Sequence, residues 1–390
     1  MTTLRTEVVV VGGGPAGAVA AHVLARAGRR VVLVEASADG SASRVGEALA
    51  PAARPILARL GLLDRVRRGD HLTCPGNVSV WGSETPRQHN FLRDPHGPGL
   101  HLDRAELDAS LRAAAAESGA RVVMESRVRS VERGNSGWCL ELSTGGASRV
   151  SESLQCDWLI DATGRSSALS GRFGDRRRQD NLIAFVARWR PRAHSNPDRD
   201  ARTFIEASED GWWYSARLPG GERVVAFHTD SDLIDAGALR TARGFNEHLS
   251  KAPYLKALLI THGYVLSGRP RGADASSSRL DPVAGDGYVA VGDAAISLDP
   301  LSSQGLFNAL FTGLRGAEAV DAALAGRPQS IEAYKRRLAS IYTAFLDHRR
   351  QYYALEGRWS SHLFWQRRQP RWASLGAQEL AWSGERAYRY

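Results

Sequence analysis

A glycine-rich turn near the start of the chain has the residue types and spacing that bind a pyrophosphate. Gly12, Gly14 and Gly17 form a G-x-G-x-x-G pattern directly after the valine run 8–11. Gly12 permits a tight turn, Gly14 lets the backbone approach a phosphate, and Gly17 lets a helix pack closely against a strand. Glu35, 18 positions after Gly17, can accept hydrogen bonds from ribose hydroxyls. The pattern predicts a dinucleotide site, and it serves NAD and FAD equally well.

This turn works only if a strand precedes it and a helix follows it. The β-branched run 8–11 is typical of a buried parallel strand, residues 18–27 form an alanine-rich helix pattern, and 31–34 reads as a second parallel strand. The helix N-terminus carries partial positive charge and free N–H groups that would face the phosphates. The sequence therefore predicts a strand, turn, helix and strand in succession.

Three later segments distinguish between the two dinucleotides. Arg-Val-Gly-Glu follows the second strand, and Asp-Trp-Leu-Ile-Asp-Ala-Thr-Gly-Arg is a strand that runs into a glycine turn. The third segment is another strand that ends at Gly-Asp and leads to Asp-Pro-Leu-Ser-Ser-Gln-Gly, with a helix pattern from Leu306 onward. The segments occupy residues 44–47, 157–165, 288–295 and 299–305.

In this order the motifs resemble the two-domain FAD fold shared by aromatic hydroxylases, flavin-dependent halogenases and geranylgeranyl reductases. The resemblance implies that Asp293 bonds a ribityl hydroxyl and that the loop beginning at Pro300 lies against the flavin ring. It also implies that the helix after Gly305 points its N-terminus at the isoalloxazine O2 region, where a reduced flavin carries negative charge. Arg104 is expected to approach the cofactor, and Arg44 is a further candidate.

The expected fold class is α/β. We expect an FAD-binding Rossmann-like domain of the glutathione-reductase type, an inserted antiparallel-sheet substrate domain and a C-terminal helical segment. The FAD-binding domain is assigned to 1–75, 100–170 and 272–330, the substrate domain to 76–99 and 171–271, and the helical segment to 331–390.

Aromatic residues mark the candidate substrate region. Segments 212–219 and 223–228 are predicted to form a hairpin around the turn Pro-Gly-Gly-Glu. Trp81, Trp213 and Tyr214 are candidates for the pocket, although neighbours on a strand point to opposite faces. His228 is a candidate catalytic base or substrate contact, and a structural histidine is the alternative.

Further aromatic residues follow in the C-terminal helical segment. They are predicted either to clamp the helix onto the FAD-binding domain or to form a rim that helps hold a large substrate. They lie in Gln-Tyr-Tyr-Ala-Leu-Glu-Gly-Arg-Trp and Phe-Trp-Gln-Arg-Arg, at residues 351–359 and 364–368.

Several stretches are more similar to one branch of the family, the tryptophan-halogenase-like monooxygenases. That branch includes the maturases that help convert a protein tryptophan into a quinone cofactor in lysine and glycine oxidases. The matching stretches are 45–53, 81–83, 101–104, 356–359 and 364–368.

Lysine usage separates halogenation from hydroxylation within this branch. Halogenases of the family use a lysine near the substrate and carry a W-x-W-x-I-P stretch, whereas this chain has no lysine before Lys251 and has Trp-Tyr-Ser-Ala-Arg-Leu-Pro at 213–219. Arginine stays protonated and lacks a free amine, so it is a poor substitute.

The resemblance thus implies hydroxylation of an electron-rich aromatic ring with dioxygen through a flavin C4a-hydroperoxide. The substrate is expected to be a small molecule or a tryptophan side chain in a peptide or protein, and the electron source NAD(P)H or a partner flavin reductase. A flavin-dependent halogenase, a geranylgeranyl-type flavin reductase and a non-catalytic FAD-binding maturation chaperone remain alternatives.

Composition excludes several other classes. The 390 residues carry a formal charge of +9, but no nucleic-acid-binding motif accompanies the basic residues. Three cysteines without a C-x-x-C pair argue against a disulfide scaffold or a zinc ribbon and favour a reducing cytoplasm. No metal motif is present, and no apolar run approaches the roughly 20 residues that span a bilayer.

Overall fold

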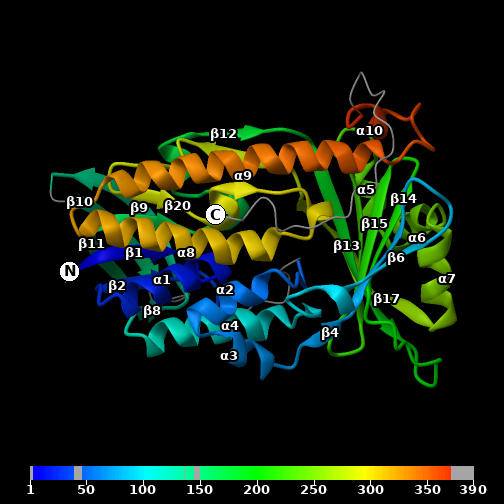
Figure 1. Cartoon of the computed structure of the whole chain (residues 1–390), viewed down its shortest axis with the longest axis horizontal. Coiled ribbons are helices and arrows are strands. Elements are labelled where there is room, and N and C mark those ends of the chain that lie inside the picture. The colour runs from blue at the N-terminus through cyan, green and yellow to red at the C-terminus, as the bar shows by residue number, and fades with distance from the viewer. Residues whose placement is uncertain (1–2, 39–45, 136, 145–149, 370–390) are drawn as a thin grey trace.

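Two large sheets, joined by one long helix, make up the molecule. The structure is a computed structural model that describes residues 3–38, 46–135, 137–144 and 150–369. In Figure 1, the N-terminal sheet with its helices lies at the left and the second sheet lies at the right. Helix α9 (Gln329–Ala354) runs along the molecule from the first half to the second. Both large elements predicted from the sequence are therefore present.

The first sheet has eight strands and a parallel centre. Its main order is β19-β20-β11-β1-β2-β8, with β10 beside β11 and β9 beside β10. Strand β1 pairs in parallel with β2 and β11, and its four valines are all buried because helices or strands cover both faces. The strands are β1 (Thr3–Val11), β2 (Val31–Val34), β8 (Arg121–Val123), β9 (Ser126–Gly134), β10 (Gly137–Thr144), β11 (Val150–Asp161), β19 (Ala284–Gly285) and β20 (Tyr288–Ala290).

Helices α1 (Pro15–Arg26), α4 (Arg104–Glu117) and α8 (Gly305–Leu324) pack beside this sheet. Small residues bring α1 and α8 close together, since a Cβ atom on Gly313 would lie 2.4 Å from the carbonyl oxygen of Ala16. The apolar core between these helices and the sheet fixes the two helix N-termini, at Pro15 and Gly305, relative to the strand ends.

The second sheet has seven strands in the order β17-β13-β16-β15-β14-β5-β6. The predicted hairpin is confirmed, because β15 and β16 pair antiparallel around the turn 218–222. Strands β5 and β6 come from an earlier part of the chain and join the same sheet through β14. The strands are β5 (Gly76–Val80), β6 (Arg87–Asn90), β13 (Leu182–Pro191), β14 (Thr203–Ser208), β15 (Gly211–Arg217), β16 (Arg223–Asp230) and β17 (Tyr264–Asp274).

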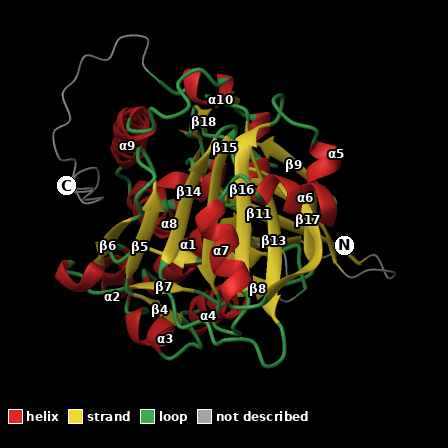
Figure 2. Ribbon diagram, turned by 90° about the vertical axis from the view of Figure 1, so that its right-hand side faces the viewer, coloured by secondary structure: helices red, strands yellow, loops and turns green. Residues whose placement is uncertain are grey.

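The two faces of the second sheet have different coverings. Helices α5 (Ala236–Leu239), α6 (Ala242–Leu249) and α7 (Pro253–Thr261) lie on one face, in front of the strands in Figure 2. The other face packs against the C-terminal part of the chain and the loop before α8. Residues that alternate along each strand therefore have unequal access to the first half of the molecule.

Two small sheets, three short α-helices and five 3₁₀ turns complete the described fold. One small sheet has the order β3-β7-β4, and the other has the order β12-β18-β21. The elements are β3 (Ala48–Leu49), β4 (Leu72–Cys74), β7 (Gly99–His101), β12 (Asp175–Arg178), β18 (Ser278–Asp281), β21 (Ile296–Ser297), α2 (Ala53–Leu60), α3 (Leu63–Arg67) and α10 (Leu363–Gln366).

The aromatic residues after α9 pack against the second sheet. Trp365 donates its indole N–H to the carbonyl oxygen of Ser208 at 2.9 Å, and its ring lies 5.3 Å from that of Trp81. The predicted clamp onto the FAD-binding domain is only part of the arrangement, because the apolar surface that these aromatics cover comes mostly from Trp81 and from β13, β14 and β15, with Leu301 of the loop before α8 in the same cluster. Within the described residues, no helix has the length and apolar composition needed to cross a membrane.

Candidate functional site

Backbone contacts explain the glycines of the first turn. Gly12 has a φ of 108°, and a Cβ atom there would lie 2.3 Å from the carbonyl oxygen of Ala162. A Cβ atom on Gly17 would lie 1.9 Å from the carbonyl oxygen of Gly12. Any side chain at either position would collide with backbone, so the turn requires glycine at both.

The acidic residue at the end of β2 reaches this turn. Glu35 is buried, and its carboxylate accepts hydrogen bonds from the N–H groups of Gly13 at 2.6 Å and Ser37 at 2.9 Å. Among the described residues, no side chain caps the N-terminus of α1 at Gly14 and no acid lies in its first turn. The helix N–H groups therefore remain available to a phosphate, which fits a dinucleotide.

The Asp-Ala-Thr-Gly-Arg segment after β11 forms a tightly bonded turn beside the glycines. Asp161 is buried and accepts hydrogen bonds from the backbone N–H and hydroxyl groups of both Thr163 and Ser170. Arg165 donates to the carbonyl oxygens of Ser276 and Leu298, at 2.7 and 3.1 Å. This turn thus fixes the position of the loop that leads to α8.

Asp293 lies where β20 ends, directly after Gly292, which has a φ of 61°. Its side chain is 34% exposed, and one carboxylate oxygen lies 3.5 Å from the Nε of Arg165. Its carbonyl oxygen accepts a hydrogen bond from Arg176 at 2.8 Å. The backbone is therefore held, while the carboxylate stays accessible to a hydroxyl group such as one of the ribityl chain.

The loop before α8 is a short, capped turn. Asp299 is buried, and its Oδ1 accepts a hydrogen bond from the N–H of Leu301 at 2.9 Å, which starts the 3₁₀ turn Pro300–Ser302. Helix α8 then begins at Gly305, where an added Cβ atom would meet nothing within 4 Å. Within the described part of the chain, its first turn holds no acid and its N-cap residue makes no side-chain cap. Such an N-terminus suits an anionic ring edge.

Of the two candidate arginines, the structure describes Arg104 and not Arg44. Arg104 is the first residue of α4, donates to the carbonyl oxygen of Gly46 at 2.8 Å and lies 3.5 Å from the carboxylate of Asp108. It thereby holds the start of the segment that follows β2. Arg44 lies outside the described residues.

Strand register creates a row of residues on the face of the second sheet that lies opposite α5, α6 and α7. Val186, Ala226, Tyr214 and Ile205 lie opposite one another on β13, β16, β15 and β14. All except Ala226 are half-buried. Leu301, in the loop before α8, packs against the same apolar cluster. The row therefore lies on the side of the sheet that meets this loop, and because the loop is predicted to lie against the flavin ring we name the row the flavin-facing row.

Tyr214 adds a polar group to the flavin-facing row. Its hydroxyl oxygen is buried, and no described residue supplies it with a hydrogen-bond partner. Burial raises the pKa of Tyr214 well above its usual value, and the nearby carboxyl group of Glu47 adds to the shift. Glu47 is itself buried, and its Oε1 lies 3.3 Å from a guanidinium nitrogen of Arg188 on β13. A polar corner thus adjoins the apolar row.

The other aromatic candidates lie in packed surroundings. Trp213 is fully buried against Phe227 and Phe245, on the face that α6 and α7 cover. Trp81 packs against Tyr353 and donates its indole N–H to the carbonyl oxygen of Tyr352 at 2.9 Å. Trp213 therefore occupies a core position away from the flavin-facing row, and Trp81 a position beneath the C-terminal segment.

His228 is buried in a ring stack. Its imidazole lies parallel to the indole of Trp212, with ring centres 3.8 Å apart and an interplanar angle of 5°. Burial lowers the pKa of His228 to about 3, so the ring is neutral at pH 7. A neutral, stacked histidine is typical of a structural residue, and this arrangement gives no support to its role as a catalytic base.

Stretches that the sequence singled out separately meet in space. Glu356 is fully buried and accepts a hydrogen bond from the N–H of Gly82 at 2.7 Å, although 274 positions separate the two residues. It also pairs with Arg358, which lies over the ring of Trp359. The Glu-Gly-Arg-Trp stretch thus closes over Trp-Gly-Ser, which explains why the two stretches belong to one pattern.

Sequence reasoning missed four residues of the site. Arg165 stands in a motif that the sequence analysis quotes, and its place after a glycine turn was a usable signal. Glu47 stands in another quoted motif. Tyr353 stands in the quoted aromatic stretch 351–359, which did not indicate its partners. Arg188 carries no local signal, because only the packing of β13 brings it here.

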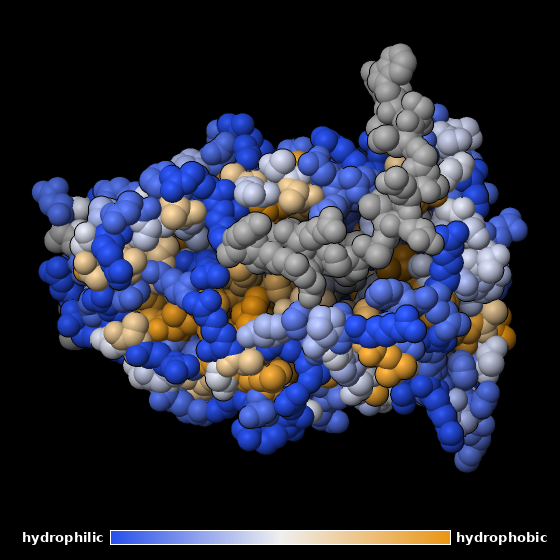
Figure 3. All heavy atoms as spheres, in the orientation of Figure 1, coloured by the Kyte–Doolittle hydropathy of each residue, from blue (hydrophilic) through white to orange (hydrophobic). Residues whose placement is uncertain are grey.

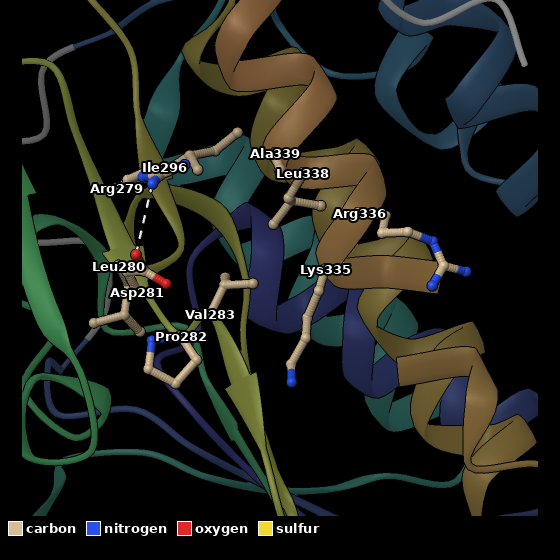
Figure 4. Close-up of a pocket in the computed structure, with 10 residues that line it drawn as sticks. All are labelled: Arg279, Leu280, Asp281, Pro282, Val283, Ile296, Lys335, Arg336, Leu338 and Ala339. Atoms are coloured by element: carbon tan, nitrogen blue, oxygen red, sulfur yellow. Dashed lines mark ion pairs between the residues drawn. The ribbon is translucent and has the colours of Figure 1, made fainter. Parts of the chain in front are cut away.

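A groove of about 260 Å³ lies elsewhere, between α9 and the small sheet that contains β18. Figure 4 shows Lys335 and Arg336 on its helix side and Pro282 and Val283 on the other. None of the candidate site residues lines it. Within the described residues, no group of three metal-ligating side chains is present.

The family model "FAD binding domain" matches residues 5–310. The chain belongs to this FAD-binding family. It is 30% identical over 371 residues to LodB of Marinomonas mediterranea, named as an FAD-dependent oxidoreductase. The match covers 93% of this chain and 96% of that relative. The resemblance inferred from the motifs is therefore confirmed, and the chain is an FAD-dependent oxidoreductase.

Solved structures confirm the fold. The myxobacterial chondrochloren halogenase CndH is similar with a TM-score of 0.85 and 24% identity, over 94% of this chain and 86% of that one. The peptidyl tryptophan dihydroxylase QhpG, essential for tryptophylquinone cofactor biogenesis, is similar with a TM-score of 0.74 and 23% identity, over 96% and 81%. The α/β class with an FAD-binding fold is thus confirmed.

The residues present fit FAD. The glycine turn with Glu35 suits the pyrophosphate and ribose, Asp293 suits the ribityl chain, and the N-terminus of α8 suits the anionic edge of the ring. On the face shown in Figure 3, hydrophobic residues gather toward the middle around α2 and α8, and further ones lie at the right-hand end. The cofactor site and the flavin-facing row together define the candidate active site.

Proposed function

We propose that this protein is an FAD-dependent monooxygenase that hydroxylates an electron-rich aromatic ring, with a tryptophan side chain in a peptide or protein as its preferred substrate. The observation that carries the proposal is the flavin-facing row, which presents half-buried apolar side chains and one unpartnered hydroxyl beside the loop before α8. The similarity to LodB and to a peptidyl tryptophan dihydroxylase supports the substrate class.

The chain's own residues supply binding, orientation and exclusion of water. Bound FAD supplies the reduction and activation of dioxygen. The apolar side chains of Val186 and Ile205 hold the flat face of the substrate ring, and the Tyr214 hydroxyl, paired with no described residue, binds a polar ring atom such as an indole N–H. Holding the ring near the reacting atom contributes several kcal/mol through proximity.

The positions of the lysines favour hydroxylation over halogenation. Lys251 pairs with Glu209 and Asp210 after α6, and Lys256 is exposed on α7, the helix that covers the far face of the sheet. Lys335 pairs with Glu332 on α9. These are the three lysines of the chain, and none belongs to the flavin-facing row. Without an amine there, delivery of hypohalous acid lacks its usual carrier.

The test supplies FAD, oxygen-18 gas and either NADH, NADPH or a flavin reductase, since the electron source is part of the proposal. Tryptophan-containing peptides and free tryptophan serve as substrates, with excess bromide present. We expect a peptide product that is heavier by one or more labelled oxygens. A reduced product, or NAD(P)H consumption without any product, would contradict the monooxygenase and favour a reductase or a binding chaperone.

Flavin-dependent halogenation is the second candidate. The structural similarity to CndH, the higher of the two TM-scores, supports it. In the experiment above, a brominated peptide would establish this candidate and overturn the argument from the lysines.

A further inference from the structure

A chain of hydrogen bonds joins the second sheet to the loop before α8. Trp212 on β15 donates its indole N–H to the hydroxyl oxygen of Tyr353 on α9 at 3.0 Å. The Tyr353 hydroxyl donates in turn to Oδ2 of Asp299 at 2.9 Å. All three side chains are at most 1% exposed. The segments that they join are separated by up to 141 positions in the sequence.

Donor and acceptor roles set the direction of this hydrogen-bond series. An indole N–H can only donate, and a tyrosine hydroxyl has one hydrogen. The Tyr353 oxygen accepts from Trp212, and its single hydrogen is donated to Asp299. The other oxygen of Asp299 accepts from the N–H of Leu301, so the hydrogen-bond series ends on the backbone of the loop. Buried hydrogen bonds in such a series polarise and strengthen one another.

Ion pairs fix Tyr353 from both sides. Arg349, one helical turn before it on α9, pairs with Asp180 just ahead of β13. Arg368 pairs with Asp230 at the end of β16, and its guanidinium group lies 5.2 Å from the centre of the Tyr353 ring. The hydroxyl is thus held by the second sheet and not by the helix alone.

We propose that Tyr353 is a positioning residue that fixes the flavin loop, residues 299–304, relative to the substrate sheet. The inference rests on the proposed function in that it takes this loop as the wall of the flavin ring site. Through Trp212, which stacks on His228, the sheet that carries the flavin-facing row and the loop beside it become one rigid unit. Tyr353 itself need touch neither substrate nor cofactor.

The experiment measures hydrogen–deuterium exchange of the backbone amides of residues 301–303 in Tyr353→Phe, without added FAD. The matched control is Tyr334→Phe, because Tyr334 is also buried on α9 and donates its hydroxyl to one carbonyl oxygen, that of Ala290 at 2.8 Å. We expect exchange in the loop to become about fivefold faster in Tyr353→Phe, the effect of one hydrogen bond, and to stay unchanged in the control.

A second variant, Trp212→Phe, removes the far donor and keeps a flat but smaller ring against His228. It should accelerate the same amides by a smaller factor, and it keeps the test available if Tyr353→Phe does not fold. Equal loop exchange in Tyr353→Phe and Tyr334→Phe, or faster exchange in neither, would overturn the inference.

Titration with FAD provides a second reading. We expect the FAD affinities of the wild type and Tyr353→Phe to agree within twofold. The visible absorption band of bound flavin should differ between the variant and the wild type. A wild type that binds no FAD would contradict the proposed function, whereas the exchange result would still decide the role of Tyr353. An identical band in both proteins would count against the positioning role.

Discussion

The glycine turn and the substrate sheet are built in opposite ways. In the turn, several contacts join residues that lie within about 25 positions, such as Gly12 with Gly17 and Gly13 with Glu35, and the backbone at Ala162 adds a distant one. At the sheet, the contacts join the segment after β5 to α10 and to the segment after α9, so that Trp81 meets Trp365 and Gly82 meets Glu356. The glycine turn is thus shaped largely by its own stretch of sequence, whereas the substrate sheet exists only after distant segments have packed.

The two regions are therefore sensitive to different kinds of substitution. The turn depends on backbone conformation, so a single added carbon atom would disrupt it. The sheet depends on buried polar pairs and ring contacts that no short stretch of sequence contains. Variants in the two regions should therefore separate loss of FAD binding from loss of stability.

The largest effect is expected from a buried ion pair of the second sheet. Arg223 on β16 donates to Asp198 at 2.6 Å, and both side chains are almost completely buried. Arg223→Ala should lower the free energy of unfolding by about 3–5 kcal/mol, because it leaves a buried carboxylate without its cation. Urea unfolding at pH 7 measures this.

The control for that variant is Arg190→Ala, which breaks an exposed pair with Glu222 on the same sheet. Its cost should stay below about 1 kcal/mol. Similar losses in both variants would mean that the sheet does not depend on its buried pair.

The next effect concerns the cofactor end. Asp293→Ala should weaken FAD binding by about 1.5–3 kcal/mol, the range for a hydrogen bond to a charged group, with little change in stability because the side chain is one-third exposed. Fluorescence titration with FAD measures the affinity. Asp286→Ala, which removes an exposed carboxylate paired with Arg133, serves as the control and should bind FAD like the wild type.

A pH effect follows from the stack on β15 and β16. Burial lowers the pKa of His228 to about 3, whereas the unfolded chain has a value of about 6.5. The unfolded state therefore binds more protons below pH 6.5, and stability falls as the pH drops from 6.5 toward 3.

Between pH 7 and pH 5 this group should cost the wild type about 1–2 kcal/mol. His228→Phe, which keeps a flat ring against Trp212, should lose less stability over the same interval. His101, whose pKa burial lowers to about 4, stays in both proteins and cancels from the comparison. Parallel pH profiles of the wild type and the variant would contradict the prediction.

The smallest stability effect is expected at Tyr214. Its hydroxyl is buried without a partner among the described residues, so Tyr214→Phe should leave the unfolding free energy unchanged or raise it by up to about 1 kcal/mol. Product formation should nevertheless fall. Trp213→Phe is the counterpart, since it shrinks a packed core residue and should lower stability more than product formation.

Much of the fold was predictable because its signals are local. The strands at 8–11 and 31–34 lie within β1 and β2, and the hairpin over 212–228 is present as predicted. The alternation rule indicated that Trp213 and Tyr214 face opposite sides, but not which side faces the cofactor half. The covering helices α6 and α7 decide this, and they follow the hairpin in the chain.

By itself, the sequence determined the dinucleotide turn, because glycine spacing and valine runs constrain the backbone over a few residues, and the order of its later motifs indicated FAD through their resemblance to a known family. Tertiary structure alone decided that Trp212, Tyr353 and Asp299 form one hydrogen-bonded series and that Glu47 meets Arg188. It also decided that the C-terminal aromatics cover the second sheet. The physical reason is that burial and pairing depend on which surfaces pack together, and the chain brings those surfaces together only when it folds.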